Sequence, residues 1–221
     1  MKIFIKSCLS GVKQARGLVV IIDVISASST IVNLFEAGVK AIIPVSSLKK
    51  AREMREKNRD YLLCSESRYR LSGIDLVNSP IISTDVGGKT ILMKTDAGTR
   101  GILEAKKAAQ VIVGCFLNCQ AIVNYIKTVK PVQLTLVPMG SGGKKPAIED
   151  ELCALYIKGL LEGKKVNFED VKKKIITGSA KNILRYLTNR KKLIASLSLN
   201  TSKTAPVLVG GSLQSFKSKA S

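Results

Sequence analysis

The sequence predicts an α/β protein with a layered α/β/α arrangement and a mostly parallel sheet. Two observations support this fold class. Short runs rich in β-branched residues alternate along the chain with longer segments of helical period. One run, LVVIIDVI at residues 18–25, is almost wholly aliphatic, as expected of a parallel strand covered by helices on both faces. The length of 221 residues allows one compact unit over 1–221, or two α/β lobes, 1–86 and 87–221, with a site between them.

The first half of the chain is predicted to alternate strands with two helices. The expected strands are the apolar runs 3–5, 18–25, 41–45 and 61–64. After SASST, apolar residues recur at helical spacing until Gly38 interrupts them, and the charged segment 47–58 is expected to form a second helix. Segment 71–83 has no clear period and closes on Asn78-Ser79-Pro80, so we expect it to be irregular.

The second half follows Gly87-Gly88 and continues the same alternation. The expected strands are 90–95, 111–116 and 132–137, and the expected helices are 98–109, about 118–128 and 147–161. The pattern stays helical from 163 to 192, with a break near Thr177-Gly178. The tail, 199–221, is rich in Ser, Gly and Lys and is expected to contain one short strand, 207–209.

Composition excludes several classes of protein. The sequence contains no histidine, which removes Ser-His-Asp and Cys-His catalysis, HExxH zinc sites and imidazole acid–base chemistry. A hydrophobic fraction of 45% excludes a disordered basic tail protein, because such chains lack apolar residues to bury.

The formal net charge of +20 indicates either an anionic partner or a solvated lysine-rich surface. Nucleic acid is not favoured as the partner, because only five Phe and five Tyr are available for base stacking and no nucleic-acid-binding motif occurs. The solvated lysine-rich surface is the preferred interpretation of the charge taken by itself, and a small anionic substrate is the alternative. The oligomeric state stays open, and a homodimer is compatible with the aliphatic helices.

The five cysteines are an odd number spread over the chain. Lys2 and Lys6 interrupt the early apolar run, so we expect no signal peptide, and no apolar stretch reaches membrane-spanning length. We therefore expect a cytoplasmic protein with reduced thiols and no membrane partner. Cys115 and Cys119 are spaced as a metal pair can be, but core packing fits them better in a chain without histidine.

Polar residues follow several predicted strands, where parallel sheets bind ligands. Asp23 lies at the end of an aliphatic strand, where a buried acid needs a partner. Ser28, Ser29 and Thr30 then stand at a helix start and can form an oxyanion cradle. Ordinary N-capping explains one of these hydroxyls but not three together with an acid.

Three further strand ends carry candidate residues. Glu66 follows strand 61–64 and is weak evidence by itself. Gly98, Thr99 and Arg100 lead from a strand into a helix and can bind a phosphate or sulfonate, although a capped tight turn explains the spacing equally well. The last is the loop GSGGKKP, with Lys144 and Lys145, followed by Glu149 and Asp150. These two acids either favour a helix start or ligate Mg²⁺.

Taken together, these segments resemble the 2-phosphosulfolactate phosphatase family of coenzyme M biosynthesis. The resemblance runs from about Leu18 to Leu161 and rests on the following segments in order: VVIIDVISASSTI, the helix ending Glu36-Ala37-Gly38, AIIPV, LLCSES…GIDLVNSP, KTDAGTRGI, VIVGCFLNCQAI and AIEDELCA. It implies a Mg²⁺-dependent hydrolase that removes phosphate from a small, anionic, sulfonated carboxylic acid.

The resemblance also implies which residues serve the site. The positions that match the family pattern are Asp23, Glu66, Asp75, Asn78, Gly98, Thr99, Arg100, Asn118, Glu149 and Asp150. We expect Asp23, Glu66, Glu149 and Asp150 to be catalytic, with Asp23, Glu66 and Asp150 holding the metal ion. We expect the substrate to contact Ser28, Ser29, Thr30, Asn78, Gly98, Thr99, Arg100 and Asn118.

The chain departs from the family pattern at three places. Ser26 replaces the arginine of DVxRATT, and Ser67 replaces the arginine of Gly-Glu-Arg. The family's Thr-Asn-Gly-Thr becomes Asp96-Ala97-Gly98-Thr99. Serine replaces a bidentate arginine poorly. Either the substrate differs, or lysines 94, 144 and 145 compensate, or the chain is an inactive homologue that binds anions or nucleic acid.

Overall fold

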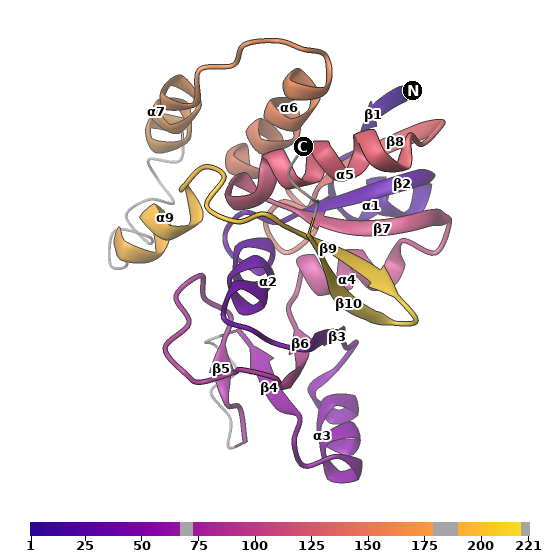
Figure 1. Cartoon of the computed structure of the whole chain (residues 1–221), viewed down its shortest axis with the longest axis vertical. Coiled ribbons are helices and arrows are strands. Elements are labelled where there is room, and N and C mark those ends of the chain that lie inside the picture. Colours follow the sequence, from indigo (N-terminus) through magenta and orange to yellow (C-terminus); the bar gives the residue numbers. More distant parts are fainter. Residues whose placement is uncertain (67–72, 179–189, 218–221) are drawn as a thin grey trace.

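The computed structural model describes residues 1–66, 73–178 and 190–217 and has the predicted α/β architecture (Figure 1). A ten-stranded sheet forms its centre, in the strand order β1-β8-β2-β7-β9-β10-β3-β6-β4-β5. The sheet consists of two groups of parallel strands joined by an antiparallel hairpin. The predicted mostly parallel, layered α/β/α fold is therefore confirmed.

The first parallel group contains the aliphatic strand in a central position. Its members are, in spatial order, β1 (Lys2–Ile5), β8 (Gln133–Pro138), β2 (Gly17–Ile22) and β7 (Ala108–Gly114). Side chains of β2 alternate between two cores: Val20 and Ile22 belong to one, and Val19 and Ile21 to the other. Both faces of β2 are thus buried, which explains why its sequence has no polar alternation.

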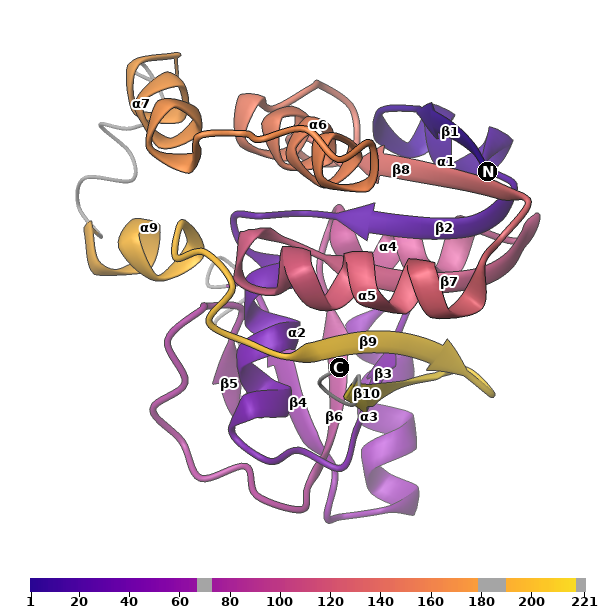
Figure 2. The ribbon, with the colours of Figure 1, turned by 45° about the horizontal axis from the view of Figure 1, so that its top comes forward.

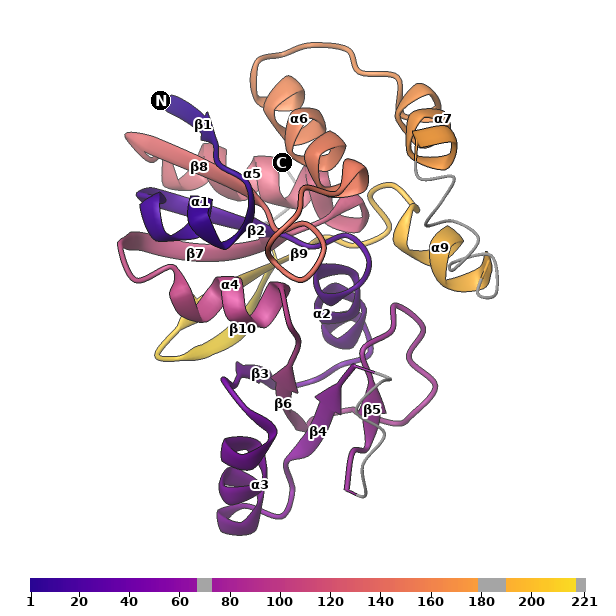
Figure 3. The same ribbon diagram turned by 180° about the vertical axis from the view of Figure 1, so that it is seen from behind.

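Helices cover both faces of this group. The core that contains Val20 is closed by α5 (Cys119–Val129) and α6 (Ile148–Leu161), in front of the sheet in Figure 2. The opposite face carries α1 (Cys8–Gln14) and α4 (Gly98–Glu104), seen in Figure 3. Helix α2 (Ala27–Glu36) packs against the same core as α4 and also contacts the C-terminal hairpin.

The second parallel group is smaller. It contains, in spatial order, β3 (Ala41–Pro44), β6 (Thr90–Lys94), β4 (Leu62–Ser65) and β5 (Leu76–Val77). Helix α3 (Leu48–Lys57) covers it through a core in which Ala51 contacts Leu63 and Leu92. Each of the two groups combines strands from before and after residue 86.

The C-terminal hairpin joins the two groups. The strand expected at 207–209 is present but begins earlier, at Thr204, and a second strand that was not predicted follows it. Strands β9 (Thr204–Val209) and β10 (Ser212–Lys217) pair along six residues each, around Gly210 and Gly211. Both glycines have positive φ, 56° and 83°, as a two-residue hairpin turn requires. The sequence hides these strands because serine, lysine and a proline interrupt their alternation, while their position in the sheet is set by tertiary pairing.

Other boundaries differ from the predictions for local reasons. Strand β2 ends at Ile22, so Asp23 lies in the loop that follows. The predicted helix 98–109 stops at Glu104, because β7 already begins at Ala108. Helix α1 was not predicted, since it is short and contains a glycine, and it is held by burial of Leu9 and Val12.

The predicted helical stretch from 163 to 192 forms two helices in the described residues, α7 (Phe168–Gly178) and α9 (Arg190–Ser196), and the part between them lies outside these residues. Within the described ranges, no helix is both long and apolar enough to cross a membrane.

Glu36, the last residue of α2, ties the hairpin to the rest of the molecule. Its Oε1 atom accepts hydrogen bonds from Ser202 Oγ at 2.6 Å and from Thr204 Oγ1 at 2.9 Å. Hydrogen bonds to a charged acceptor stabilise more than neutral ones. Glu36 therefore fixes the start of β9, the strand that joins the hairpin to β7.

We expect Glu36→Ala to lower the free energy of unfolding by about 1–3 kcal/mol, because two hydroxyls lose a charged acceptor. Urea denaturation measures this change. Glu53→Ala is the matched control, since Glu53 is an exposed glutamate on α3 and its replacement is expected to change stability by less than about 0.5 kcal/mol. Equal midpoints for the two variants would contradict the role of Glu36.

Candidate active site

The candidate site forms where chain segments leave β2, β6 and β8, and a close backbone contact brings two of them together. Gly98, at the start of α4, lies against Asp23, which follows β2. A Cβ atom at Gly98 would lie 2.6 Å from the Cβ of Ala27 and 3.0 Å from Asp23 Oδ2. Only glycine permits this approach. The contact places the start of α4, which follows β6 of the smaller strand group in the chain, beside the end of β2.

Asp23 is the central carboxylate of the site. It is 8% exposed, and its Oδ1 atom accepts a hydrogen bond from the Ala27 N–H at 3.3 Å. Burial raises the pKa of Asp23 to about 6, backbone N–H groups of Ala27 and Gly98 oppose this, and the charges of Glu66 and Glu149 add to it. Asp23 is thus a carboxylate whose proton affinity is tuned toward neutral pH.

Asp150 braces the loops that follow β2 and β8. Its Oδ1 atom accepts the Val24 N–H at 2.7 Å, and Oδ2 accepts the Gly140 N–H at 2.8 Å. Burial, together with the charges of Asp23 and Glu149, raises the pKa of Asp150 well above its ordinary value. Burial also raises the pKa of Glu149. Three carboxyl groups, one from the loop after β2 and two from the first turn of α6, therefore lie within electrostatic reach of one another.

The predicted seryl cradle is packed inward. The Ser28 hydroxyl accepts the Asp23 N–H at 2.9 Å, Ser29 Oγ donates to the Val24 carbonyl at 2.6 Å, and Thr30 Oγ1 donates to the Ser26 carbonyl at 2.8 Å. These three side chains are buried. They fix the loop around Asp23, and direct contact with a substrate stays a prediction.

Other predicted residues are distributed around the site. Thr99 Oγ1 accepts the Thr95 N–H at 2.7 Å and caps the turn into α4. Glu66 Oε1 accepts the Asp96 N–H at 2.7 Å, which joins the end of β4 to the end of β6. The Asn78 carbonyl accepts Ser26 Oγ at 3.4 Å.

Asn118 and Asp75 serve as structural ties in the described chain. Asn118 is fully buried, and its amide nitrogen donates to the carbonyls of Val113 and Thr204, so it joins β7 to the hairpin. Asp75 pairs with Arg55 at 2.8 Å. These contacts leave their proposed functional roles as predictions.

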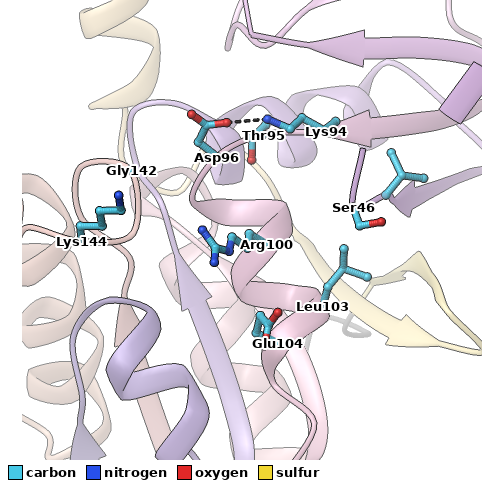
Figure 4. Close-up of a pocket in the computed structure, with 10 residues that line it drawn as sticks. Ser46, Lys94, Thr95, Asp96, Arg100, Leu103, Glu104, Gly142 and Lys144 are labelled. Carbon is cyan, nitrogen blue, oxygen red and sulfur yellow. Dashed lines mark hydrogen bonds and ion pairs between the residues drawn. The ribbon is translucent and has the colours of Figure 1, made fainter. Parts of the chain in front are cut away.

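A pocket of about 490 Å³ opens beside these strand ends (Figure 4). It is lined by Val45, Ser46, Lys94, Thr95, Asp96, Arg100, Leu103, Glu104, Gly142 and Lys144. Figure 4 shows the Arg100 side chain extending from α4 toward the loop that carries Gly142 and Lys144. Three cations from β6, α4 and this loop therefore surround one space, which suits an anionic ligand.

The glycine-rich loop is held in shape by its backbone. The backbones of Ser141 and Lys145 form an isolated antiparallel β-bridge. The Leu9 N–H of α1 donates to the Gly143 carbonyl at 3.0 Å. Gly140 has a φ of 67°, and a Cβ there would lie 2.1 Å from the Lys145 carbonyl oxygen. This geometry turns Lys144 toward the pocket, whereas Lys145 does not line it.

Sequence reasoning missed the pocket residues Val45, Ser46, Leu103 and Glu104. Val45 and Ser46 carried a usable signal, because they follow a predicted strand at the edge where ligands bind. Leu103 and Glu104 line the pocket from the last turn of α4, and although the sequence predicts a helix that begins at Gly98, its pattern does not mark these two residues as pocket residues.

Two kinds of magnesium site are relevant to the carboxylates around Asp23: one with three or more protein ligands, and one in which water and substrate supply most ligands. Over the described ranges 1–66, 73–178 and 190–217, no three Asp, Glu or Cys side chains gather closely enough to hold a metal ion together. Magnesium commonly uses only one or two protein carboxylates and completes its shell with water and substrate phosphate. The binding of such an ion by one or two of the acids around Asp23 stays a prediction.

Known proteins resemble the chain over most of its length. A family model described as 2-phosphosulpholactate phosphatase matches residues 5–205. A probable 2-phosphosulfolactate phosphatase from Carboxydothermus hydrogenoformans is 34% identical over 69% of this chain and 64% of that protein. Proteins with the same name from Clostridium perfringens and Caldanaerobacter subterraneus are 32% and 39% identical, over 79% and 49% of this chain and 74% and 47% of their own lengths.

The raised pKa of Asp23 predicts a pH-dependent stability. The folded protein binds this proton more tightly than an unfolded chain, whose aspartate has a pKa near 3.8. Wild-type stability therefore falls as pH rises from about 4 through about 6. Relative to wild type, Asp23→Asn is expected to gain about 1–3 kcal/mol of unfolding free energy across this window.

Chemical denaturation of both proteins from pH 3.5 to 8 in EDTA measures this difference, with the chelator excluding stabilisation by divalent cations. Asp60→Asn is the control, because the Asp60 side chain is 88% exposed. A difference between wild type and Asp23→Asn that does not change with pH would refute the assignment.

Proposed function

The chain belongs to the 2-phosphosulfolactate phosphatase family, and from this premise we propose that it hydrolyses the phosphate ester of a small anionic acid such as 2-phosphosulfolactate. The observation that carries the proposal is the pocket lined by Lys94, Arg100 and Lys144. The carboxylates around Asp23 do not line it, but they are held against the same chain segments, because Asp23 lies against Gly98 of α4 and Asp150 accepts the N–H of Gly140 in the glycine-rich loop. Cations bind the anionic ester, and carboxylates supply proton transfer. The absence of histidine is consistent with such a site.

Asp23 is the preferred proton acceptor. A pKa of about 6 leaves the carboxylate ionised at neutral pH yet more basic than an ordinary aspartate, which suits general-base catalysis. Its orientation is fixed by the Ala27 N–H and by the close approach of Gly98. Glu66 and Glu149 lie within electrostatic range of it and are the next candidates for activating water.

We propose Mg²⁺ as the cofactor, held by one or two of Asp23, Glu66, Glu149 and Asp150. When bound, it would neutralise charge on the phosphoryl oxygens. The donor chemistry supports this choice, because carboxylate oxygens are the protein ligands that Mg²⁺ prefers. Burial raises the pKa of Asp23 and Asp150, and the charges of nearby carboxylates add to this, so a cation among these side chains is favoured.

Asp150 is better suited to positioning than to proton transfer. Both its oxygens accept backbone N–H groups, so it holds the loop after β2 against the glycine-rich loop. Arg100 and Lys144, which reach the pocket from different elements, are assigned to binding the substrate anion. Both roles are part of the proposal.

The rival function is anion or nucleic-acid binding without turnover. Two features favour it: Ser26 and Ala97 stand where the family pattern has an arginine and an asparagine, and Ala97 provides no side-chain cap to α4. Ser67, which also stands where the family pattern has an arginine, lies outside the described residues. The net charge of +20 is compatible with a polyanionic ligand.

Phosphate release from 2-phosphosulfolactate and related esters, with Mg²⁺ or with EDTA, tests the proposal. We expect release only with the metal, and we expect Asp23→Asn to lower kcat by about 100-fold or more because the base is lost. Asp60→Asn, at an exposed position, is the matched control and should retain wild-type rates.

Equal rates for Asp23→Asn and wild type, or no metal-dependent release from any ester, would count against the enzyme. Retention of labelled DNA in a gel, falling steeply with salt, would then favour the rival function.

A further inference from the structure

The cationic pocket contains an acid that anion binding alone does not explain. Lys94, Arg100 and Lys144 share its wall with Asp96 and Glu104. A carboxylate in such a wall repels every anion that enters. In the family pattern described above threonine occupies the position of Asp96, so the acid is a feature of this chain.

Asp96 is fixed from two directions. Its Oδ1 atom accepts a hydrogen bond from Lys94 Nζ at 2.5 Å, and its backbone N–H donates to Glu66 Oε1 at 2.7 Å. The Lys94 and Asp96 side chains are 17% and 32% exposed, so water and salt screen the pair less than a fully exposed one. Lys94 therefore lies in the pocket with most of its charge balanced.

Arg100 and Lys144 differ from Lys94 in this respect. Both are exposed, and in the part of the chain that the structure describes neither has an ion-pair partner. They reach the same space from α4 and from the glycine-rich loop (Figure 4). The positive charge available to a ligand therefore comes chiefly from these two residues.

We infer that Asp96 is a specificity-determining residue. Because of Asp96, the pocket prefers a phosphate ester whose second acid group carries a single negative charge, and it disfavours an ester whose second acid group is a dianionic phosphate. The inference rests on the function proposed above and concerns the same pocket. A carboxylate or sulfonate is satisfied by Arg100 and Lys144. A second phosphate brings additional negative charge near Asp96 and must compete with it for Lys94.

Three two-carbon phosphate esters test this inference, since they differ mainly in the second group: phosphoglycolate, 2-sulfoethyl phosphate and ethylene glycol bisphosphate. The measured quantity is kcat/KM at pH 8, where the phosphates are dianionic. We expect wild type to favour the first two esters. Asp96→Asn should reduce this preference by about fivefold to tenfold, mainly through a lower KM for the bisphosphate.

Glu104→Gln is the matched control, because it removes the same charge from the same pocket and leaves the Lys94–Asp96 pair intact. It should change the preference less than Asp96→Asn. Equal changes in the two variants would mean that net charge alone matters, and the inference would be wrong. Asp96→Thr should reproduce the effect of Asp96→Asn and replaces it if that variant does not fold.

Calorimetric binding of inorganic phosphate and methanesulfonate at pH 8 separates this inference from the proposed reaction, because it needs no turnover. If no ester is hydrolysed but Asp96→Asn increases the affinity for phosphate relative to methanesulfonate, the proposed function fails, and the inference that Asp96 disfavours a dianionic group stands. If the esters are hydrolysed and Asp96→Asn leaves their ratio unchanged, the function stands and the inference fails.

Discussion

The close approach of Gly98 to Asp23 is the constraint on which the candidate site depends. Within the sheet, the narrow β9–β10 hairpin joins the two parallel strand groups and pairs with each group at a single residue pair. Helix α4 makes a second link, because its first turn lies against Asp23 and Ala27. Since a side chain at position 98 would overlap Ala27, the relation between the pocket and the buried carboxylates requires glycine there.

A second layer of contacts turns this link into a site. Asp150 uses its two carboxylate oxygens to hold Val24 and Gly140, so the loops after β2 and β8 keep a fixed separation. The glycine-rich loop then delivers Lys144 to the pocket that Lys94 and Arg100 line from the other side. Backbone N–H groups thus position both the acids and the cations, which gives the site rigidity that surface side chains would lack.

The sequence was informative wherever chemistry and strand ends coincide. Asp23, Arg100 and Lys144 could be named because polar residues in the segments that follow aliphatic strands mark the binding edge of a parallel sheet. The same rule could not reveal the C-terminal hairpin, whose polar strands form only because Ile112 and Ile42 offer partners from distant parts of the chain. Local pattern carries no information about such pairing.

Sequence pattern also failed to separate residues that face a ligand from residues that hold the backbone. Ser29 and Asn118 suggest binding by their type and place. In the structure their side chains donate to the carbonyls of Val24 and Thr204, and their contact with a substrate stays a prediction. Arg100 comes from an equally ordinary turn and points into the pocket. The difference is one of side-chain direction, which depends on helix start and crossing angle rather than on composition.

The energetic cost of the buried acids argues that they serve more than the fold. Asp23 and Asp150 are nearly inaccessible, burial raises the pKa of each, and within the described ranges neither has a lysine or arginine partner. Backbone hydrogen bonds offset only part of the desolvation of a carboxylate. The chain has 36 basic residues, but none of those described pairs with these two acids. Lys94, Arg100 and Lys144 line the pocket instead. Buried acids and a pocket lined by cations, held against the same chain segments, are the arrangement that a phosphate ester and a divalent ion, bound together, would bring to neutrality.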